Sequence, residues 1–165
     1  MAPIKSRLTA GILLFAVWFL LMYPLSGQEA AAGIIISLIL VFLPLPNLQV
    51  FSSIRFTPKA ILYSVFFLFV FLWEVIKSNI DVALRVLKPV IPLKPGIVKV
   101  NTTLRSELGR LVLANAITLT PGTITVDITE NQLYIHWIAV DADGVDQSTK
   151  KIVSHFEKYL EVIFG

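Results

Sequence analysis

The stretch TPKAILYSVFFLFVFLWEVIKSNIDVALRVL, residues 57–87, decides the organisation of this chain. Its first part, residues 60–76, is an apolar run whose one charge, Glu74, lies near its end. As a helix, about 17 residues reach roughly 25 Å, which is most of a hydrocarbon core of about 30 Å. Trp73 stands where an aromatic side chain would meet the lipid headgroups, and Lys77 follows it. The sequence therefore predicts a short membrane span that continues as a helix outside the membrane.

Charged residues recur along the second part of this helix at spacings of three, four and four, which places them on one helical face. They are Glu74, Lys77, Asp81 and Arg85. The opposite face is apolar and predicts contact with lipid or with protein. Its residues are Ile76, Ile80, Ala83, Leu84 and Leu87. The four charged residues are candidates for a subunit interface, with a direct proton relay as the alternative.

The composition is that of a small membrane protein. Of the 165 residues, 56% are hydrophobic and 15% are charged, which is too apolar for an ordinary soluble domain. The sequence contains no cysteine, so disulfides and thiolate metal sites are excluded. The net charge of +3 is not gathered among aromatic residues, and it is assigned to membrane topology rather than to a nucleic-acid partner.

Two more apolar runs, residues 8–25 and 31–45, precede this stretch. Only residues 26–30 separate them, which predicts a tight helical hairpin, and Pro44 and Pro46 end the second run. Neither run contains a charged residue, so nothing in the hairpin supports ion conduction. A signal peptide cleaved near residues 30–32 is the competing interpretation. The first run exceeds the usual length of about 7–15 residues and a second run follows it, which favours a retained N-terminus.

The basic residues conflict with three full spans. Lys5 and Arg7 precede the first run, Arg55 and Lys59 precede the third, and further cations follow it, whereas residues 23–30 contain none. The positive-inside rule therefore favours the cytoplasm for everything except that loop, yet three spans put the two ends on opposite sides. Either the N-terminus faces outward despite its cations, or one run does not fully cross. We expect the C-terminal part to be cytoplasmic, because it holds the most basic residues.

A change of composition marks a domain boundary. Pro89, Pro92 and Pro95 recur every third residue, which favours an extended strut, and a Pro-rich ligand segment is the alternative. We therefore expect a transmembrane helical region at residues 1–88, a Pro-rich strut at 89–96 and a small α/β peripheral domain at 97–165. The predicted fold is a membrane α-helical part with three apolar helices, followed by a small α+β domain of order βαββα.

Local sequence patterns predict the strands and helices of the peripheral domain. Residues 97–100 predict a strand, and Thr102 or Thr103 caps a helix that Pro121 and Gly122 end. One face of that helix is expected to be buried: Leu104, Leu108, Leu111, Val112, Asn115 and Leu119. Residues 123–129 and 132–140 alternate as two strands around a Glu130-Asn131 turn. Residues 141–144 are a loop, and a final helix begins at Thr149 with four buried positions, Ile152, Phe156, Leu160 and Ile163.

This hairpin register predicts which residues meet. Ile128 would face Leu133, Val126 would face Ile135, and Ile124 would face Trp137, all on the core side. On the other side, Asp127 would face Tyr134 and Thr125 would face His136, so that Asp127 and His136 become diagonal neighbours. An acid beside a histidine invites an enzymatic interpretation. A catalytic pair also needs a nucleophile or a metal, and only Thr125 is nearby, so we predict no enzyme.

Metal and cofactor sites find no support either. His136 and His155 are the only histidines, and neither has a partner at ligand spacing. Asp141, Asp143 and Asp146 lack the closing glutamate of a calcium loop. The chain has neither a phosphate-binding loop nor a dinucleotide fingerprint, so no cofactor is expected.

One further segment carries a family resemblance. Residues 115–127, NAITLTPGTITVD, followed by LYIHW at residues 133–137, closely resemble the E subunit of the multisubunit cation/proton antiporters of the Mrp, Mnh or Pha type. The residues that carry the motif are Asn115, Thr118, Thr120, Pro121, Gly122, Asp127 and Trp137. The similarity extends from the third apolar run to about Val140. From the residues themselves, these positions build a turn after a helix and are structural rather than a sodium site.

The resemblance implies an accessory, multi-pass subunit of a cell (inner) membrane complex that exchanges sodium for protons. Its partners would be the other antiporter subunits and the lipid bilayer, with Na+ and H+ moving through the complex. In that family the large subunits carry the recognised proton-translocating residues, and no catalytic motif transfers to this chain. The alternative function is a membrane-anchored binding domain that recruits a soluble partner.

Overall fold

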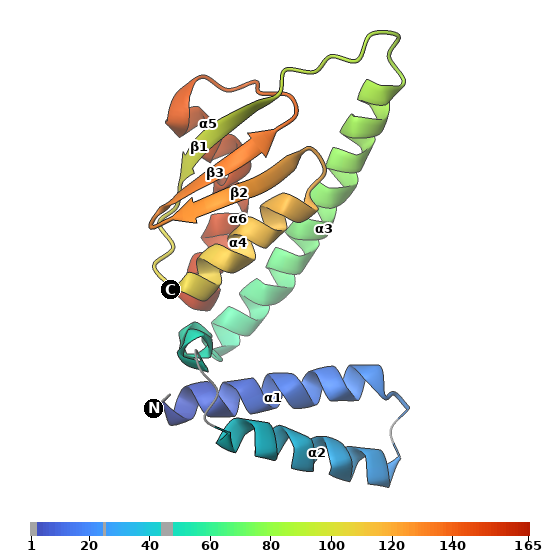
Figure 1. Ribbon diagram of the computed structural model, residues 1–165, viewed down its shortest axis with the longest axis vertical. Helices are drawn as coiled ribbons and strands as arrows, with labels where there is room; N and C mark the ends of the chain where they lie inside the picture. The colour runs from blue at the N-terminus through green and yellow to red at the C-terminus, as the bar shows by residue number, and fades with distance from the viewer. Residues whose placement is uncertain (1–2, 25, 44–47) are drawn as a thin grey trace. The chain divides into compact units, whose positions relative to one another are not determined.

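The computed structural model describes residues 3–24, 26–43 and 48–165, and the chain forms two compact units, Met1–Ile54 and Arg55–Gly165 (Figure 1). In the first unit, α1 (Ile4–Leu21) and α2 (Gly27–Phe42) form the predicted hairpin, and a 3-10 helix, η1 (Leu48–Ser53), follows. By length and composition, α1 and α3 (Pro58–Val86) could each cross a membrane, whereas α2 is shorter. The predicted helix-ending residues Pro44 and Pro46, and Leu25 at the end of the first run, lie outside the described residues.

The helix α2 begins earlier than expected because Ser26 caps it. The Ser26 hydroxyl accepts from the Glu29 backbone N–H at 3.3 Å, and the Glu29 carboxylate accepts from the Ser26 N–H at 2.7 Å. This reciprocal pair is a capping box, and it places most of the predicted loop in the first turn of α2.

Small residues let α1 and α2 approach closely. A Cβ on Gly33 would collide with the Trp18 ring, and a Cβ on Gly11 would lie 2.8 Å from Val41. The Trp18 indole donates to the Glu29 carbonyl at 3.0 Å. At the other end, Lys5 donates to the Ser52 carbonyl at 3.2 Å, so η1 returns to the start of α1.

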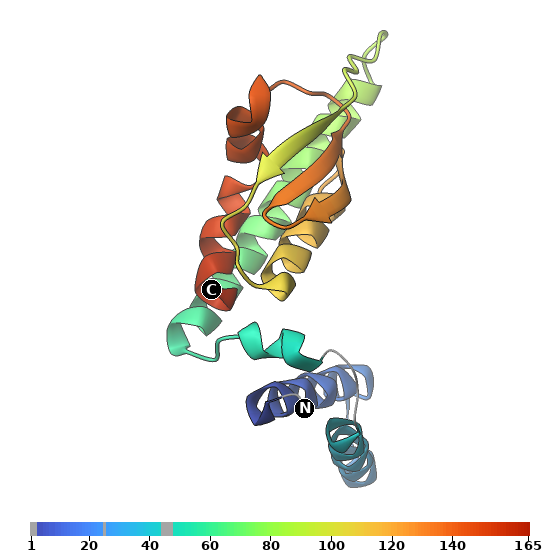
Figure 2. The same cartoon turned by 60° about the vertical axis from the view of Figure 1, so that its left-hand side comes forward.

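The second unit is layered. Its sheet has the order β1-β3-β2 and is antiparallel, with β1 (Gly96–Asn101), β2 (Thr123–Thr129) and β3 (Gln132–Trp137). The helices α4 (Glu107–Leu119) and α6 (Ser154–Phe164) lie against one face of it, α3 packs on α6, and α5 (Gly144–Ile152) lies beside β1 (Figures 1 and 2). The core between sheet and helices is formed by residues such as Val100, Leu113, Leu133, Ile135 and Phe156.

The helix α3 belongs to this second unit. Thr57 caps it by accepting from the Ala60 N–H at 3.1 Å, and Pro58 occupies its first turn. Beyond its end, the Pro-rich segment brings the chain back to the sheet, where Lys94 donates its N–H to Ile138 at 3.1 Å and accepts from Val140 at 2.8 Å. The apolar helices followed by a small sheet with helices agree with the predicted fold, while the predicted division at residues 89–96 stays a prediction.

A β-bulge changes the predicted hairpin register. The turn at Glu130 and Asn131 is correct, since Thr129 pairs with Gln132 and Ile128 with Leu133. Beyond Asp127 the register shifts, so that Thr125 pairs with Ile135 and Ile124 with His136. The predicted pairs of Val126 with Ile135 and of Ile124 with Trp137 are therefore wrong, and the side chains of Ile124 and Val126 are exposed.

Two helices also differ from expectation. The cap of α4 is Ser106, which accepts from the Gly109 N–H at 3.1 Å, while the Thr102 hydroxyl and the Thr103 N–H both donate to Glu157 of α6. The buried residues of α4 are Gly109, Leu113, Ala114, Ala116 and Ile117. Of the residues predicted to be buried, Leu104 is buried just before the helix, whereas Leu111, Asn115 and Leu119 are exposed. The single predicted final helix is two helices, α5 and α6, that meet at Val153. Its four predicted buried positions are confirmed.

Candidate functional site

A charged cleft lies between α3 and the rest of the second unit. It encloses about 200 Å³. The charged face of α3 forms one wall, the turn after α4 and the end of β3 form the floor, and the junction of α5 and α6 forms the other wall. All four charged residues predicted on α3 line it, so the structure brings them together against this chain's own α/β layer.

Two ion pairs lie along the α3 wall. Arg85 contacts Asp81 at 2.6 Å, and Lys77 contacts Glu74 at 3.5 Å. The Glu74 side chain is only 19% exposed, whereas that of Lys77 is 66% exposed. Glu74 therefore lies toward the cleft, and Lys77 reaches solvent. The Arg85 guanidinium also donates to the Pro92 carbonyl at 3.4 Å, which ties the Pro-rich segment to the end of α3.

The opposite wall carries residues that the sequence did not single out as a site. Lys151 contacts the Asp141 carboxylate at 2.9 Å and donates to the Asp141 carbonyl at 2.9 Å. Half-buried His155, in the first turn of α6, also lines the cleft, and burial lowers its pKa, against the opposing effect of the nearby Glu74 carboxylate. The sequence signal that could have identified His155 was its position next to Phe156, which belongs to the buried stripe of α6.

A tight turn builds the floor of the cleft. The Thr120 hydroxyl donates to the Ala116 carbonyl at 2.8 Å, and the Thr123 hydroxyl donates to the Ile117 carbonyl at 2.7 Å. Gly122 has φ +96°, which an L side chain rarely adopts, and its carbonyl accepts from the Ile138 N–H at 3.0 Å. Thr120, Pro121 and Gly122 thus end α4 and start β2, and Trp137 lines the same floor.

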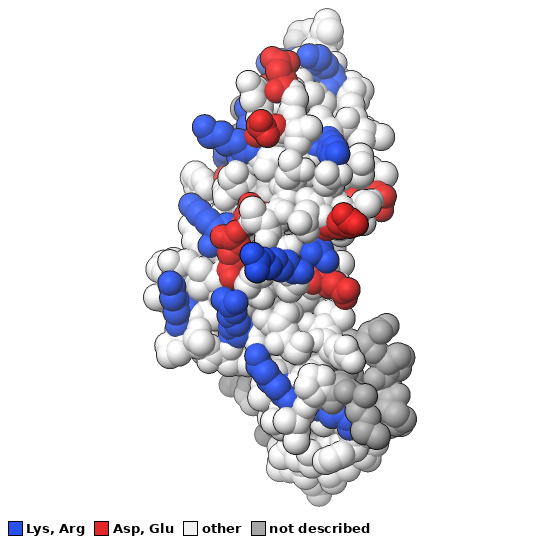
Figure 3. Space-filling view, turned by 90° about the vertical axis from the view of Figure 1, so that its left-hand side faces the viewer, with Lys and Arg blue, Asp and Glu red and all other residues white. Residues whose placement is uncertain are grey.

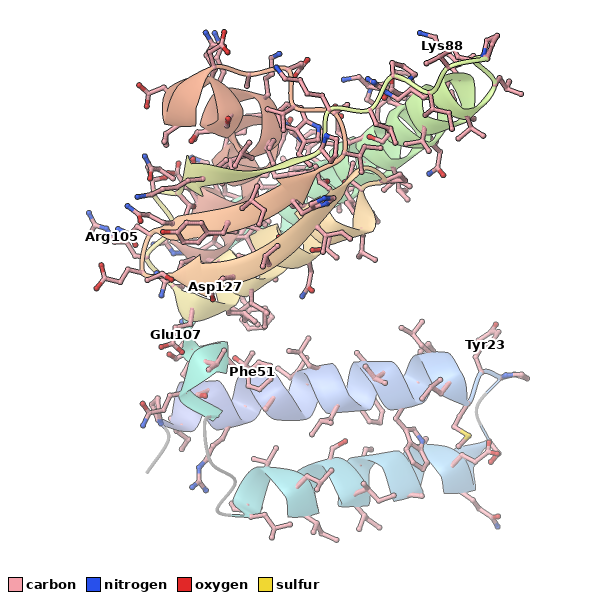
Figure 4. The ribbon with its side chains drawn as sticks, turned by 45° about the horizontal axis from the view of Figure 1, so that its top comes forward. Tyr23, Phe51, Lys88, Arg105, Glu107 and Asp127 are labelled. Atoms are coloured by element: carbon pink, nitrogen blue, oxygen red, sulfur yellow. The ribbon has the colours of Figure 1, made fainter. Side chains whose placement is uncertain are left out.

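The other motif residues lie elsewhere. Asn115, Thr118 and Asp127 line a shallow groove between α4 and β2. The Thr118 hydroxyl accepts from the Thr125 N–H at 3.1 Å, and the Thr125 hydroxyl donates to the Ala114 carbonyl. Thr125 therefore bonds to the helix α4 and pairs with Ile135, whereas Asp127, labelled in Figure 4, pairs with Tyr134. The bulge thus separates Thr125 from the acid and histidine that it was predicted to accompany.

The cleft holds oppositely charged side chains in pairs. Among residues 3–24, 26–43 and 48–165, no three histidine, aspartate or glutamate side chains come together as a metal site. Acidic and basic side chains are interspersed over the upper and middle part of the face shown in Figure 3. Such an arrangement suits a contact between protein layers better than capture of an ion.

Comparison with known proteins assigns the chain to a family. The model of the MNHE family, described as Na+/H+ ion antiporter subunit, matches residues 11–163. The E subunit of the Na+/H+ antiporter of Bacillus subtilis (strain 168) is 32% identical over 141 residues, covering 84% of this chain and 88% of the relative. The corresponding protein of Alkalihalophilus pseudofirmus is 26% identical, covering 92% and 94%. The chain therefore belongs to the family of Na+/H+ antiporter E subunits, as its motif predicted.

A solved structure is similar over the whole chain. It is a chain of the membrane-bound sulfane sulfur reductase, an archaeal respiratory membrane complex, with 40% identity and a TM-score of 0.84. The match covers 97% of this chain and 99% of that chain. The hairpin and the α/β unit are therefore both part of the shared architecture.

Proposed function

We propose that this chain is an accessory subunit of a multisubunit membrane complex that exchanges Na+ for H+. The observation that carries the proposal is the extent of the family match, which includes both the membrane hairpin and the α/β unit. The hairpin has no charged residue between Leu8 and Met22, so its role is to anchor the subunit among neighbouring membrane helices. Transport residues then lie in the larger subunits, and this chain supports their assembly.

The charged cleft is assigned to assembly in the same way. Glu74, Lys77, Asp81 and Arg85 hold the orientation of α3 against the α/β layer and contribute to the contact with a neighbouring subunit. A proton relay through Glu74 is the alternative. We place the α/β unit in the cytoplasm, because most of the basic residues belong to it or flank it.

Deletion of the chain tests this function. Sodium-dependent proton exchange in membrane vesicles and the size of the complex in mild detergent should be measured in the same deletion strain. We expect both exchange and the large complex to be lost together. A complex of normal size that lacks only this subunit and has no exchange would instead give the chain a direct part in transport.

A second host complex is favoured by one observation. The respiratory complex chain is 40% identical over 97% of this chain, whereas the antiporter subunits from the two bacteria are 26% and 32% identical. In this alternative the same accessory subunit serves a redox-driven membrane complex. Affinity purification through a tag on this chain, followed by mass spectrometry, separates the two hosts. Redox subunits with iron–sulfur clusters among the co-purified proteins identify the respiratory type, and polytopic membrane subunits without them identify the antiporter.

A further inference from the structure

One face of α3 is apolar along its whole length and has no partner within the described chain. Its residues recur at spacings of three and four, and they include Leu62, Phe69, Ile76, Ile80, Leu84 and Leu87, which are 52–80% exposed. A helix of this length extends roughly 40 Å. The stripe passes without interruption from the run predicted to span the membrane into the part predicted to lie outside it.

The opposite face of α3 packs on α6 along the first half of the helix. The rings of Tyr63 and Tyr159 lie 6.1 Å apart, and Phe71 lies 6.5 Å from Phe156. The helix α6 therefore runs beside the segment, residues 60–76, that a bilayer would have to surround. The exposed side chains of Lys158 and Glu161 on α6 would therefore lie at the level of this segment. In Figure 4, the labelled residues Lys88 and Glu107 lie at opposite ends of the second unit.

This packing is incompatible with a helix that crosses the hydrocarbon core. The exposed charged side chains of α6 would be carried into lipid, where charges are strongly unfavourable. We infer that α3 does not cross the bilayer but lies along its cytoplasmic interface, with its apolar stripe on the lipid and the α/β unit on its opposite face.

The first unit is compatible with two crossings, one by α1 and one by the shorter α2. Lys5 at the start of α1 contacts Ser52 in η1, so the chain enters and leaves the hairpin at the same end. Only residues 54–57 then separate η1 from α3. With two crossings instead of three, every lysine and arginine lies on the cytoplasmic side, and the basic-free loop of residues 23–30 lies outside. The conflict between the positive-inside rule and three spans disappears.

Charge and residue type identify the occupant of the stripe as lipid rather than protein. Lys59, Lys77 and Lys88 are exposed along α3, where ammonium groups can reach anionic headgroups while the apolar side chains enter the acyl boundary. Trp73 is 64% exposed beside the stripe, as expected of an aromatic residue at headgroup level. An apolar face bordered by cations is the pattern of an interfacial helix.

The inference is tested directly by finding from which side of the membrane each end of α3 is accessible. Because the chain has no cysteine, single-cysteine variants can be made in the full chain without background labelling. We expect Lys59→Cys and Lys88→Cys both to react with a membrane-impermeant maleimide in inverted vesicles and not in intact cells. Gln28→Cys in the hairpin loop should show the reverse. Reaction of Lys59→Cys and Lys88→Cys from opposite sides would overturn the inference, as would reaction of both from outside.

The depth of each stripe position in the bilayer distinguishes contact with lipid from contact with a covering subunit. Nitroxide labels on Leu62→Cys, Phe69→Cys, Ile76→Cys and Leu84→Cys are measured in the reconstituted complex by collision with oxygen and with a nickel chelate. We expect one common, shallow depth for all four, and shielding from both reagents for Phe67→Cys, at the position that packs on Phe156 of α6. A maximum of depth at Phe69, or shielding of the stripe, would overturn the lipid assignment. These readouts concern α3 alone, so they can fail while the deletion and purification experiments succeed.

Discussion

The ring of Phe67 on α3 meets the ring of Phe156 on α6 nearly edge to face, with the two centroids 6.0 Å apart. Phe156 is 1% exposed and also contacts the core between sheet and helices. The two phenylalanines therefore join the helix that faces lipid to the α/β fold, and the second unit has one continuous core.

Truncation of this aromatic contact should destabilise the unit as a whole. Phe156→Ala removes a fully buried ring, and we expect a loss of about 3–5 kcal/mol in the free energy of unfolding. Phe69→Ala is the matched control, because Phe69 is 66% exposed on the same helix that Phe156 contacts. Denaturant unfolding of the full chain in mild detergent measures both variants. Equal losses would mean that α3 does not pack on α6.

The sheet offers a second comparison, between neighbouring residues of β3. Trp137 packs against the core, whereas His136 lies on the outer face between Ile97 and Ile124. We expect Trp137→Ala to cost on the order of 2 kcal/mol and His136→Ala about 0.5 kcal/mol or less. The amount of subunit in the membrane and its thermal unfolding report the difference. A similar loss for both variants would give His136 a buried role.

Stability should depend on pH through His155. Its pKa is lowered by burial, in the presence of Glu74, Lys77 and Lys158, so the folded state favours the neutral ring. The unfolded state binds the proton more readily, near pH 6.5. The contribution of neutral His155 is therefore complete above about pH 6.5 and falls as the pH decreases below it. Unfolding free energies at several pH values should show a shallower acid loss for His155→Gln than for the wild type, and identical slopes would contradict the assignment.

Substitutions of Glu74 distinguish an interface role of this residue from a role as a proton relay. Its ion pair with Lys77 is worth no more than about 1 kcal/mol because Lys77 is exposed, so the pair alone does not determine folding. We expect Glu74→Ala to weaken assembly of the complex and Glu74→Gln to weaken it less, with exchange falling in parallel. Normal assembly and exchange in both variants would refute the interface role. Intact assembly with a shifted pH profile in Glu74→Gln would favour the relay.

The membrane hairpin should be intolerant of bulk at one glycine. Gly33→Val places branched atoms against the Trp18 ring, and overpacking of this kind costs about 1–3 kcal/mol. Gly27→Ala in the first turn of α2 is the control, because a Cβ there meets nothing within 4 Å. Subunit abundance in membranes and resistance of the hairpin to detergent should fall for Gly33→Val alone.

Local signals predicted much of the fold. The Glu130-Asn131 turn, the buried positions of α6 and the helical hairpin each depend on residues close in sequence, and all are confirmed. The bulge beyond Asp127 was not predictable from alternation, since a single extra residue leaves the polar and apolar pattern of β2 unchanged. The cap at Ser106 was missed because Thr102 and Thr103 have the same capping chemistry and are used instead by Glu157 of α6.

The charged cleft could not be predicted as a whole, because it forms between parts of the chain that are distant in sequence. Helical periodicity placed Glu74, Lys77, Asp81 and Arg85 on one face, and that face is the wall of the cleft. Periodicity could not indicate what lies opposite, because His155 and Lys151 reach the cleft only after the Pro-rich segment turns the sheet back onto α3.

The shared core of α3 and α6 also sets an order of events during synthesis. Phe67 is translated long before Phe156, so the aromatic face of α3 is uncovered while β1, α4, β2, β3 and α5 are still being made. Early attachment of the opposite face to lipid would hold α3 away from other nascent chains during that interval. The bilayer would then act as a folding template for the α/β unit, and a ribosome-bound chain ending before α6 should be captured by membranes but remain sensitive to protease.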